Sequence, residues 1–138
     1  MTDQKLPTQS AQPTIFAFSS IDGPMEHAGP DPDRIVSGTP VAKVRTLVES
    51  EDGRISAGMW TCTPGRWRVS YDEYEYCRIL SGKGAVIDES GTQTEIGLGD
   101  EFIVPAGFVG EWLVTETMSK HFVVLIPGSG SMDIIGGI

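Results

Sequence analysis

Glycine and proline punctuate this chain at short, regular intervals, and this spacing restricts its fold more than any other feature. Seventeen Gly and nine Pro occur among the 138 residues. From about residue 41 onward, groups of turn-forming residues recur about every eight to twelve residues, which is the spacing of short strands joined by turns. No segment of about ten or more residues shows the 3.6-residue periodicity of an amphipathic helix. The chain is therefore predicted to be all-β.

The segments between these turns are typical of antiparallel strands. The turns are rich in Gly and Pro, as in Pro64-Gly65, Gly82-Lys83-Gly84 and Pro105-Ala106-Gly107. About eight strands of this kind fit a jelly roll or small barrel of two packed antiparallel sheets, which protects the sheet edges. The expected strands cover residues 41–48, 55–62, 74–80, 85–88, 93–96, 101–104, 111–114 and 121–126.

The two ends of the chain differ from this middle region. Residues 1–40 are expected to form an N-terminal arm and a Pro/Gly-rich connection, in which 15–18 docks as a first short strand. Four prolines between residues 22 and 40 exclude a regular helix there. Residues 41–127 are expected to form one barrel, and the Gly-rich residues 128–138 a flexible tail. The length suits a single domain.

The charge balance excludes several classes of partner. Ten Lys and Arg stand against nineteen Asp and Glu, which gives a net charge of −9. A field of that sign repels phosphate backbones and anionic lipids, so we expect neither a nucleic-acid nor a membrane partner. The N-terminal sequence lacks the apolar stretch of a signal peptide, which indicates a cytoplasmic protein. In that compartment Cys62 and Cys77 are expected to be buried, reduced thiols.

Two motifs at a fixed separation suggest a specific fold. Residues 99–107, GDEFIVPAG, fit the pattern G-x5-P-x-G, and Glu75 with Gly82 fits the pattern E-x6-G. Together they resemble the double motif of the cupin superfamily, which implies a double-stranded β-helix, the RmlC-like jelly roll. More narrowly, the chain resembles the small single-domain cupins grouped with (S)-ureidoglycine aminohydrolase. The residues that carry this narrower resemblance are Trp60, Thr63-Pro64-Gly65, Tyr71-Asp72, Glu75, Cys77, Ile79-Leu80, Gly82 and Lys120-His121.

The resemblance does not extend to a metal site. Metal-binding cupins are similar to this chain but have two His before the Glu of the first motif and a third His in the second motif. Only Glu75 fills one of those four positions here; the others hold Val69 and Tyr71, or Arg68 and Ser70, and then Gly110. One carboxylate alone holds a divalent metal weakly. We therefore expect no metal cofactor, with a non-standard or adventitious divalent site built from Glu75, Glu73 or Cys77 with His121 as the alternative.

Strand alternation predicts which side chains share the interior. If Glu75 points inward, as the resemblance implies, Cys77 does too, because side chains alternate faces with period two. Of the pair Lys120-His121, only one side chain can face the interior. The expected catalytic residues are Glu75 and Tyr71, and the expected pocket residues are Trp112, Cys77, Trp60 and His121.

The expected pocket supports two classes of function. A carboxylate enclosed by Trp, Tyr and Cys has its ionised form disfavoured, which suits proton transfer by Glu75. The alternative is that Glu75 simply pairs with Arg66 or Arg68. We predict a pocket for a small polar, nitrogen-containing metabolite, either in a metal-independent acid/base enzyme or in a non-catalytic sensor or accessory protein. Cupins of this size commonly pair, so a homodimer is expected as well.

Overall fold

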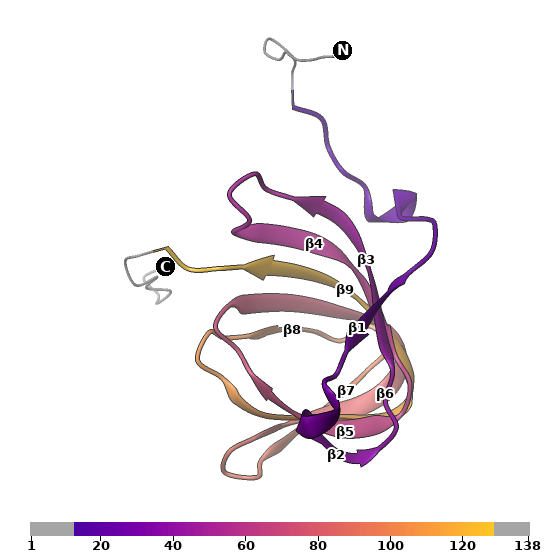
Figure 1. Ribbon diagram of the computed structural model, residues 1–138, viewed down its shortest axis with the longest axis vertical. Coiled ribbons are helices and arrows are strands. Elements are labelled where there is room, and N and C mark those ends of the chain that lie inside the picture. Colours follow the sequence, from indigo (N-terminus) through magenta and orange to yellow (C-terminus); the bar gives the residue numbers. More distant parts are fainter. Residues whose placement is uncertain (1–12, 129–138) are drawn as a thin grey trace.

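The computed structural model describes residues 13–128, and the expectations for 1–12 and 129–138 lie outside the described residues. This part of the chain is almost entirely β-structure, curled into an open barrel (Figure 1). The strands are β1 (Glu26–Gly29), β2 (Ile35–Gly38), β3 (Ala42–Glu49), β4 (Ile55–Cys62), β5 (Gly65–Ser70), β6 (Tyr74–Asp88), β7 (Gln93–Gly97), β8 (Glu101–Val104) and β9 (Val109–Leu125), with the 3₁₀ turns η2 (Phe18–Ser20) and η3 (Pro32–Arg34).

Two long strands, β6 and β9, join the two layers of the barrel. The first half of β6 pairs with β8 and with the second half of β9, which continues through β4 and β3 to β1. The second half of β6 pairs with β7 and with the first half of β9, which continues through β5 to β2. Every one of these pairings is antiparallel. The all-β jelly roll predicted from the sequence is confirmed.

The bend in β6 depends on a glycine. The register between β6 and β9 shifts three times between Ile79 and Gly84. Gly82 lies in this irregular stretch with φ +93°, a conformation that costs an L side chain about 1–2 kcal/mol. A Cβ there would meet the Thr117 carbonyl oxygen at 2.4 Å, so β9 leaves no space for a side chain. The segment 82–84, expected to be a turn, is therefore a bulge within one strand.

The observed strands differ from the expected ones at several other places. The predicted pairs 74–80 with 85–88, and 111–114 with 121–126, are each one continuous strand. Gly65, expected in a turn, begins β5. Within the expected N-terminal connection, β1 and β2 pair with β3 and β5 as edge strands. Residues 15–18 do not form the expected strand; instead η2 begins at Phe18.

The core lies between the two layers and follows the predicted alternation. Cys77 and Ile79 on β6 are fully buried, and Trp112 and Val114 on β9 are at most 2% exposed. This arrangement leaves a row of inward side chains from each long strand facing the other layer.

None of the helical turns between residues 13 and 128 is long and apolar enough to cross a membrane.

Candidate functional site

A cavity of about 490 Å³ lies between the two layers of the barrel. Its inner end is formed by β4, β5, β6 and β9, and its outer end by the segment that connects β1 to β2. A volume in this range suits a small metabolite. The lining residues are Ala28, Pro30, Asp31, Arg34, Ala42, Val44, Trp60, Trp67, Arg68, Val69, Ser70, Tyr71, Glu73, Glu75, Trp112, Lys120, Phe122 and Val124.

A buried ion pair forms the inner end of the cavity. Glu75 on β6 is 7% exposed and Lys120 on β9 is 4% exposed. Lys120 Nζ donates a hydrogen bond of 2.8 Å to Glu75 Oε2. Charges are rarely buried this deeply unless they are paired, because the loss of hydration is large. The two side chains must therefore be considered as one unit.

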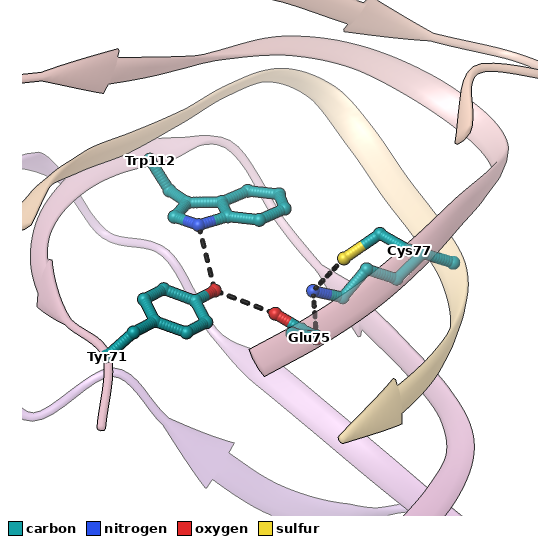
Figure 2. Close-up of polar contacts among 5 residues, drawn as sticks. Tyr71, Glu75, Cys77 and Trp112 are labelled. Atoms are coloured by element: carbon teal, nitrogen blue, oxygen red, sulfur yellow. Dashed lines mark hydrogen bonds and ion pairs between the residues drawn. The ribbon is translucent and has the colours of Figure 1, made fainter. Parts of the chain in front are cut away.

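The second oxygen of Glu75 is held by an aromatic relay. Tyr71 donates its phenolic proton to Glu75 Oε1 at 2.7 Å, and the Trp112 indole N–H donates to the Tyr71 oxygen at 3.2 Å (Figure 2). The Tyr71 backbone is itself fixed, since its N–H donates to the Phe108 carbonyl and its carbonyl accepts from Gly107 N–H. The loops between β5 and β6 and between β8 and β9 thus position the phenol over the carboxylate.

Three tryptophans make the walls of the cavity. The rings of Trp60, Trp67 and Trp112 lie with their centroids 5.8–6.4 Å apart. Lys120 Nζ lies 4.6 Å from the centre of the Trp60 ring and 4.3 Å from that of Trp112. At these distances a ring face attracts an ammonium group. The tryptophans therefore both enclose a ligand and stabilise the charge on Lys120.

Burial and charge fix the protonation of the polar groups. Burial and the nearby Glu75 carboxylate raise the pKa of Tyr71 well above its usual range. Burial likewise raises the pKa of the Cys77 thiol to about 12. For Lys120, burial lowers the pKa, but the charges of Glu75 and Cys77 and the hydrogen bonds to both together outweigh it and leave the pKa above its ordinary value. At neutral pH the site therefore contains a phenol, a thiol and an ammonium.

The outer end of the cavity is polar and more open. Arg34, next to β2, and Asp31 line it from the connecting segment, and Arg68 lines it from β5. Arg68 Nη2 donates to the Asp33 carbonyl at 2.5 Å, which ties the connecting segment to β5. Both ends of the cavity thus carry charges of both signs, but at the inner end the two charges form one ion pair.

The structure changes three of the expected placements. His121 does not line the cavity; its side chain lies on the outer face of β9, with its ring 4.5 Å from that of Phe18. Cys77 does not line the cavity either, because its sulfur lies behind Lys120, 3.5 Å from Nζ. Glu75 pairs with Lys120 rather than with an arginine, and Arg66 instead binds Glu111 at 2.5 Å.

Lys120 is the site residue that sequence reasoning missed. Trp112 was predicted to face inward, and counting by twos along β9 from Trp112 leads to Lys120. Two separate strands, 111–114 and 121–126, break this alternation between Trp112 and Lys120, so the expected strands do not connect the two residues. A single strand over 109–125 would have placed Lys120 inside and His121 outside.

The chain does not fit the metal site of metal-binding cupins. Within residues 13–128, no three His, Cys, Asp or Glu side chains converge in a way that could hold a metal ion. The position beside Glu75 is taken by the Lys120 ammonium, which repels a metal cation. The alternative site built with His121 fails because His121 lies outside the barrel.

The family comparison agrees with this fold. Residues 49–122, more than half of the chain, match the EutQ-like cupin domain family. The match supports the cupin resemblance, but the narrower grouping with (S)-ureidoglycine aminohydrolase is not supported. None of the curated proteins matches the chain.

Several solved structures share the fold at low sequence identity. A DUF861-family protein of unknown function from Pseudomonas syringae pv. tomato has a TM-score of 0.67 and 22% identity, covering 74% of this chain and 44% of its own. The EutQ protein of Clostridium difficile has a TM-score of 0.58 and 16% identity, covering 70% of each chain. A predicted oxalate decarboxylase from Thermotoga maritima has a TM-score of 0.61 and 16% identity, covering 83% and 100%. These likenesses concern the fold alone.

Proposed function

The chain belongs to the EutQ-like cupin domain family, and on this premise we propose that it binds a small polar metabolite in the barrel and transfers a proton through Glu75 without a metal. The observation that carries the proposal is the position of Glu75, buried at the inner end of an aromatic cavity with both oxygens hydrogen-bonded. Buried, specifically partnered ionisable groups in a cavity are typical of functional sites.

The arrangement supports acid/base chemistry in a defined way. Both oxygens of Glu75 accept hydrogen bonds, from Tyr71 and from Lys120, so Glu75 is the proton acceptor of the site. Tyr71 stays a neutral phenol and directs its proton to Glu75, which fixes the orientation of the carboxylate. A carboxylate held on two sides keeps a defined geometry toward the cavity, as general base catalysis requires.

A first experiment is a thermal-shift screen of small polar metabolites, including amines, ureides, hydroxy acids and carbonyl compounds. We expect at least one class to raise the melting temperature, since a ligand that binds only the folded state stabilises it. Compounds that bind would then be followed by NMR for conversion. Glu75→Gln should abolish conversion and retain binding, with Glu116→Gln as the matched surface control. Conversion by Glu75→Gln at the wild-type rate would remove Glu75 from the reaction.

A non-catalytic sensor or accessory protein is the second candidate. The observation that favours it is that Tyr71 and Lys120 already satisfy both oxygens of Glu75. A sensor would be stabilised by its ligand and would leave that ligand unchanged. Binding without conversion in the NMR assay would therefore support this candidate over the enzyme.

We also propose that the protein forms a homodimer. The apolar side chains of Ile15 and Phe16 are 94% and 58% exposed, and Ile103 on the outer face of β8 is 64% exposed. Exposed apolar groups of this kind are typical of interaction surfaces. Light scattering coupled to size-exclusion chromatography should give twice the mass of one chain, and a monomer mass would contradict the proposal.

A further inference from the structure

Lys120 brings a fixed positive charge to the inner end of the cavity. Its ammonium lines the cavity although the residue is only 4% exposed. Glu75 Oε2 lies 2.8 Å away, Cys77 Sγ lies 3.5 Å away, and the faces of two Trp rings cover it. The positive charge at the inner end of the cavity is therefore a fixed part of the protein.

One hydrogen-bond donor of this ammonium remains for a ligand. An ammonium group has three N–H bonds and no acceptor. Glu75 and Cys77 accept two of them, and the described residues 13–128 provide no third oxygen, nitrogen or sulfur acceptor. Because the group lines the cavity, an oxygen atom of a ligand is the natural partner for the third bond.

The surroundings restrict the kind of oxygen. A carboxylate ligand would place a second anion beside Glu75, with one ammonium to compensate both, and like charges at this distance disfavour each other. An amine would meet the ammonium and be repelled. An uncharged carbonyl group is an acceptor only, and the Trp60 and Trp112 faces can pack against its carbon skeleton.

We propose that Lys120 binds the carbonyl oxygen of a small uncharged ketone or aldehyde, and that Glu75 faces the carbon next to this carbonyl. The assignment names a substrate class for the proposed function and rests on it. In the substrate, the carbonyl oxygen and the hydrogen to be removed are carried by adjacent carbon atoms and so lie close together. The groups that would contact them, Lys120 Nζ and Glu75 Oε2, are also close, 2.8 Å apart. One ligand can therefore contact both groups at once.

This geometry defines a balanced proton transfer. Glu75 takes a proton from the carbon next to the carbonyl, the C–H electron pair forms a C=C bond, and the C=O π pair moves to the oxygen. The Lys120 N–H stabilises the negative charge that develops on this oxygen. Glu75 then exchanges this proton with solvent and returns one to the same carbon, which restores the carbonyl without an oxidant or reductant. Where that carbon also carries a hydroxyl group, its proton can move to the enolate oxygen to give an enediol. Return of a proton to the other carbon, with loss of the hydroxyl proton beside the first carbon, then isomerises the substrate.

The test uses matched small molecules and matched variants. The carbonyl probes are hydroxyacetone, dihydroxyacetone and acetoin, and 1,2-propanediol is the probe that lacks the carbonyl. Proton NMR in D₂O follows exchange of the hydrogens next to the carbonyl, and ligand line broadening reports binding. The variants are Lys120→Met, which removes the charge, and Lys120→Arg, which keeps it. Lys83→Met removes a lysine charge from the surface end of the same strand pair.

Wild-type protein and Lys83→Met should bind a carbonyl probe and accelerate exchange of the hydrogens next to its carbonyl. Neither protein should bind 1,2-propanediol. Lys120→Met should lose about a hundredfold to a thousandfold in exchange rate, the scale expected for one donor at a developing oxyanion. Lys120→Arg should retain part of the binding. If Lys120→Met does not fold, the double variant Glu75→Gln/Lys120→Met, which leaves no unpaired buried charge, is compared with Glu75→Gln alone and should bind the carbonyl probe more weakly. Equal binding by these two variants would overturn the assignment.

Equal binding and exchange by Lys120→Met and wild type would overturn the assignment. So would a wild-type protein that neither binds nor exchanges any of the three carbonyl probes. Loss of conversion in Glu75→Gln with no effect of Lys120→Met would retain the proposed function and reject the carbonyl assignment. If only amines or carboxylates raise the melting temperature in the metabolite screen, the proposed function is likewise retained and the carbonyl assignment is rejected.

Discussion

Two Lys–Glu ion pairs join the same two strands, and they differ most in how deeply they are buried. Inside the barrel, Lys120 of β9 pairs with Glu75 of β6 at 2.8 Å, with side chains 5% and 9% exposed. Near the bulge, Lys83 of β6 pairs with Glu116 of β9 at 3.9 Å, with side chains 70% and 62% exposed. The residue types and the strands are the same, so the comparison isolates the effect of burial.

The difference indicates what each pair does. An exposed pair gains little, because water screens it and two long side chains must be ordered. A buried pair costs hydration on both sides and rarely stabilises a protein more than apolar residues would. Its presence at the inner end of a cavity is therefore better explained by ligand binding and chemistry than by stability.

Breaking the buried pair should have the largest effect on stability. Lys120→Met leaves the Glu75 carboxylate buried and uncompensated, so we expect the free energy of unfolding to fall by about 3–5 kcal/mol. Urea unfolding measures the loss. The double variant Glu75→Gln/Lys120→Met should recover most of it, because no charge remains buried. A double variant that is less stable than either single variant would contradict this account.

The bulge that contains the exposed pair should be the next most sensitive point. Gly82→Ala combines φ +93° with a Cβ that meets the Thr117 carbonyl oxygen at 2.4 Å, and we expect a loss of at least ~2 kcal/mol. Gly99→Ala is the matched control, with φ +87° and open space around its Cβ, and should lose roughly 1 kcal/mol. Equal losses in thermal unfolding would show that the close approach of β9 is unimportant.

Alkaline pH should lower the free energy of unfolding through the three buried groups of the site. Tyr71, Cys77 and Lys120 have pKa values raised above the ordinary 10.0, 9.0 and 10.5. Above about pH 9 the folded protein therefore keeps protons that the unfolded chain loses, and the free energy of unfolding falls as the pH rises. With a pKa of about 12, Cys77 contributes roughly 3 kcal/mol of this loss by about pH 11.

The alkaline loss is measured by urea unfolding at about pH 8 and about pH 11. Cys77→Ala removes one of the three groups and should reduce the loss, whereas Lys83→Met should leave it unchanged. Stability that stays constant over this range in the wild-type protein would contradict the raised pKa values.

The smallest effect is expected at the exposed pair. Lys83→Met should change the free energy of unfolding by less than about 1 kcal/mol. It should also leave ligand binding unchanged, because Lys83 lies far along β6 from Glu75. A loss as large as that of Lys120→Met would mean that burial does not distinguish the two pairs.

The fold could be predicted from the sequence because turn residues and alternation act locally. The same local signals failed at Gly82, where a positive φ produces a bulge in a long strand instead of a turn. The cupin resemblance implied that Glu75 points inward, and alternation from the two motifs extended this placement to Cys77 and Trp112. The sequence could not show that Lys120 faces Glu75, since that contact depends on the register between β6 and β9, which turn signals do not determine.

The short strands β1 and β2 were missed for a related reason. Each has only four residues and lies among prolines, so neither shows an apolar pattern of its own. They form as edge strands because β3 and β5 offer unpaired backbone groups. The consequence for the site is that Asp31 and Arg34, which line the cavity, come from a segment that the sequence pattern indicated only as a connection.

The central claim is that a lysine ammonium, paired with Glu75, supplies the positive charge of this cavity. The most direct test is the nitrogen-15 resonance of Lys120 Nζ in metal-free protein, assigned with Lys120→Arg and followed from about pH 6 to about pH 10. The account predicts an ammonium resonance throughout, which shifts when Glu75→Gln removes the paired charge. A neutral amine at pH 7, or an Nζ resonance indifferent to Glu75→Gln, would contradict it.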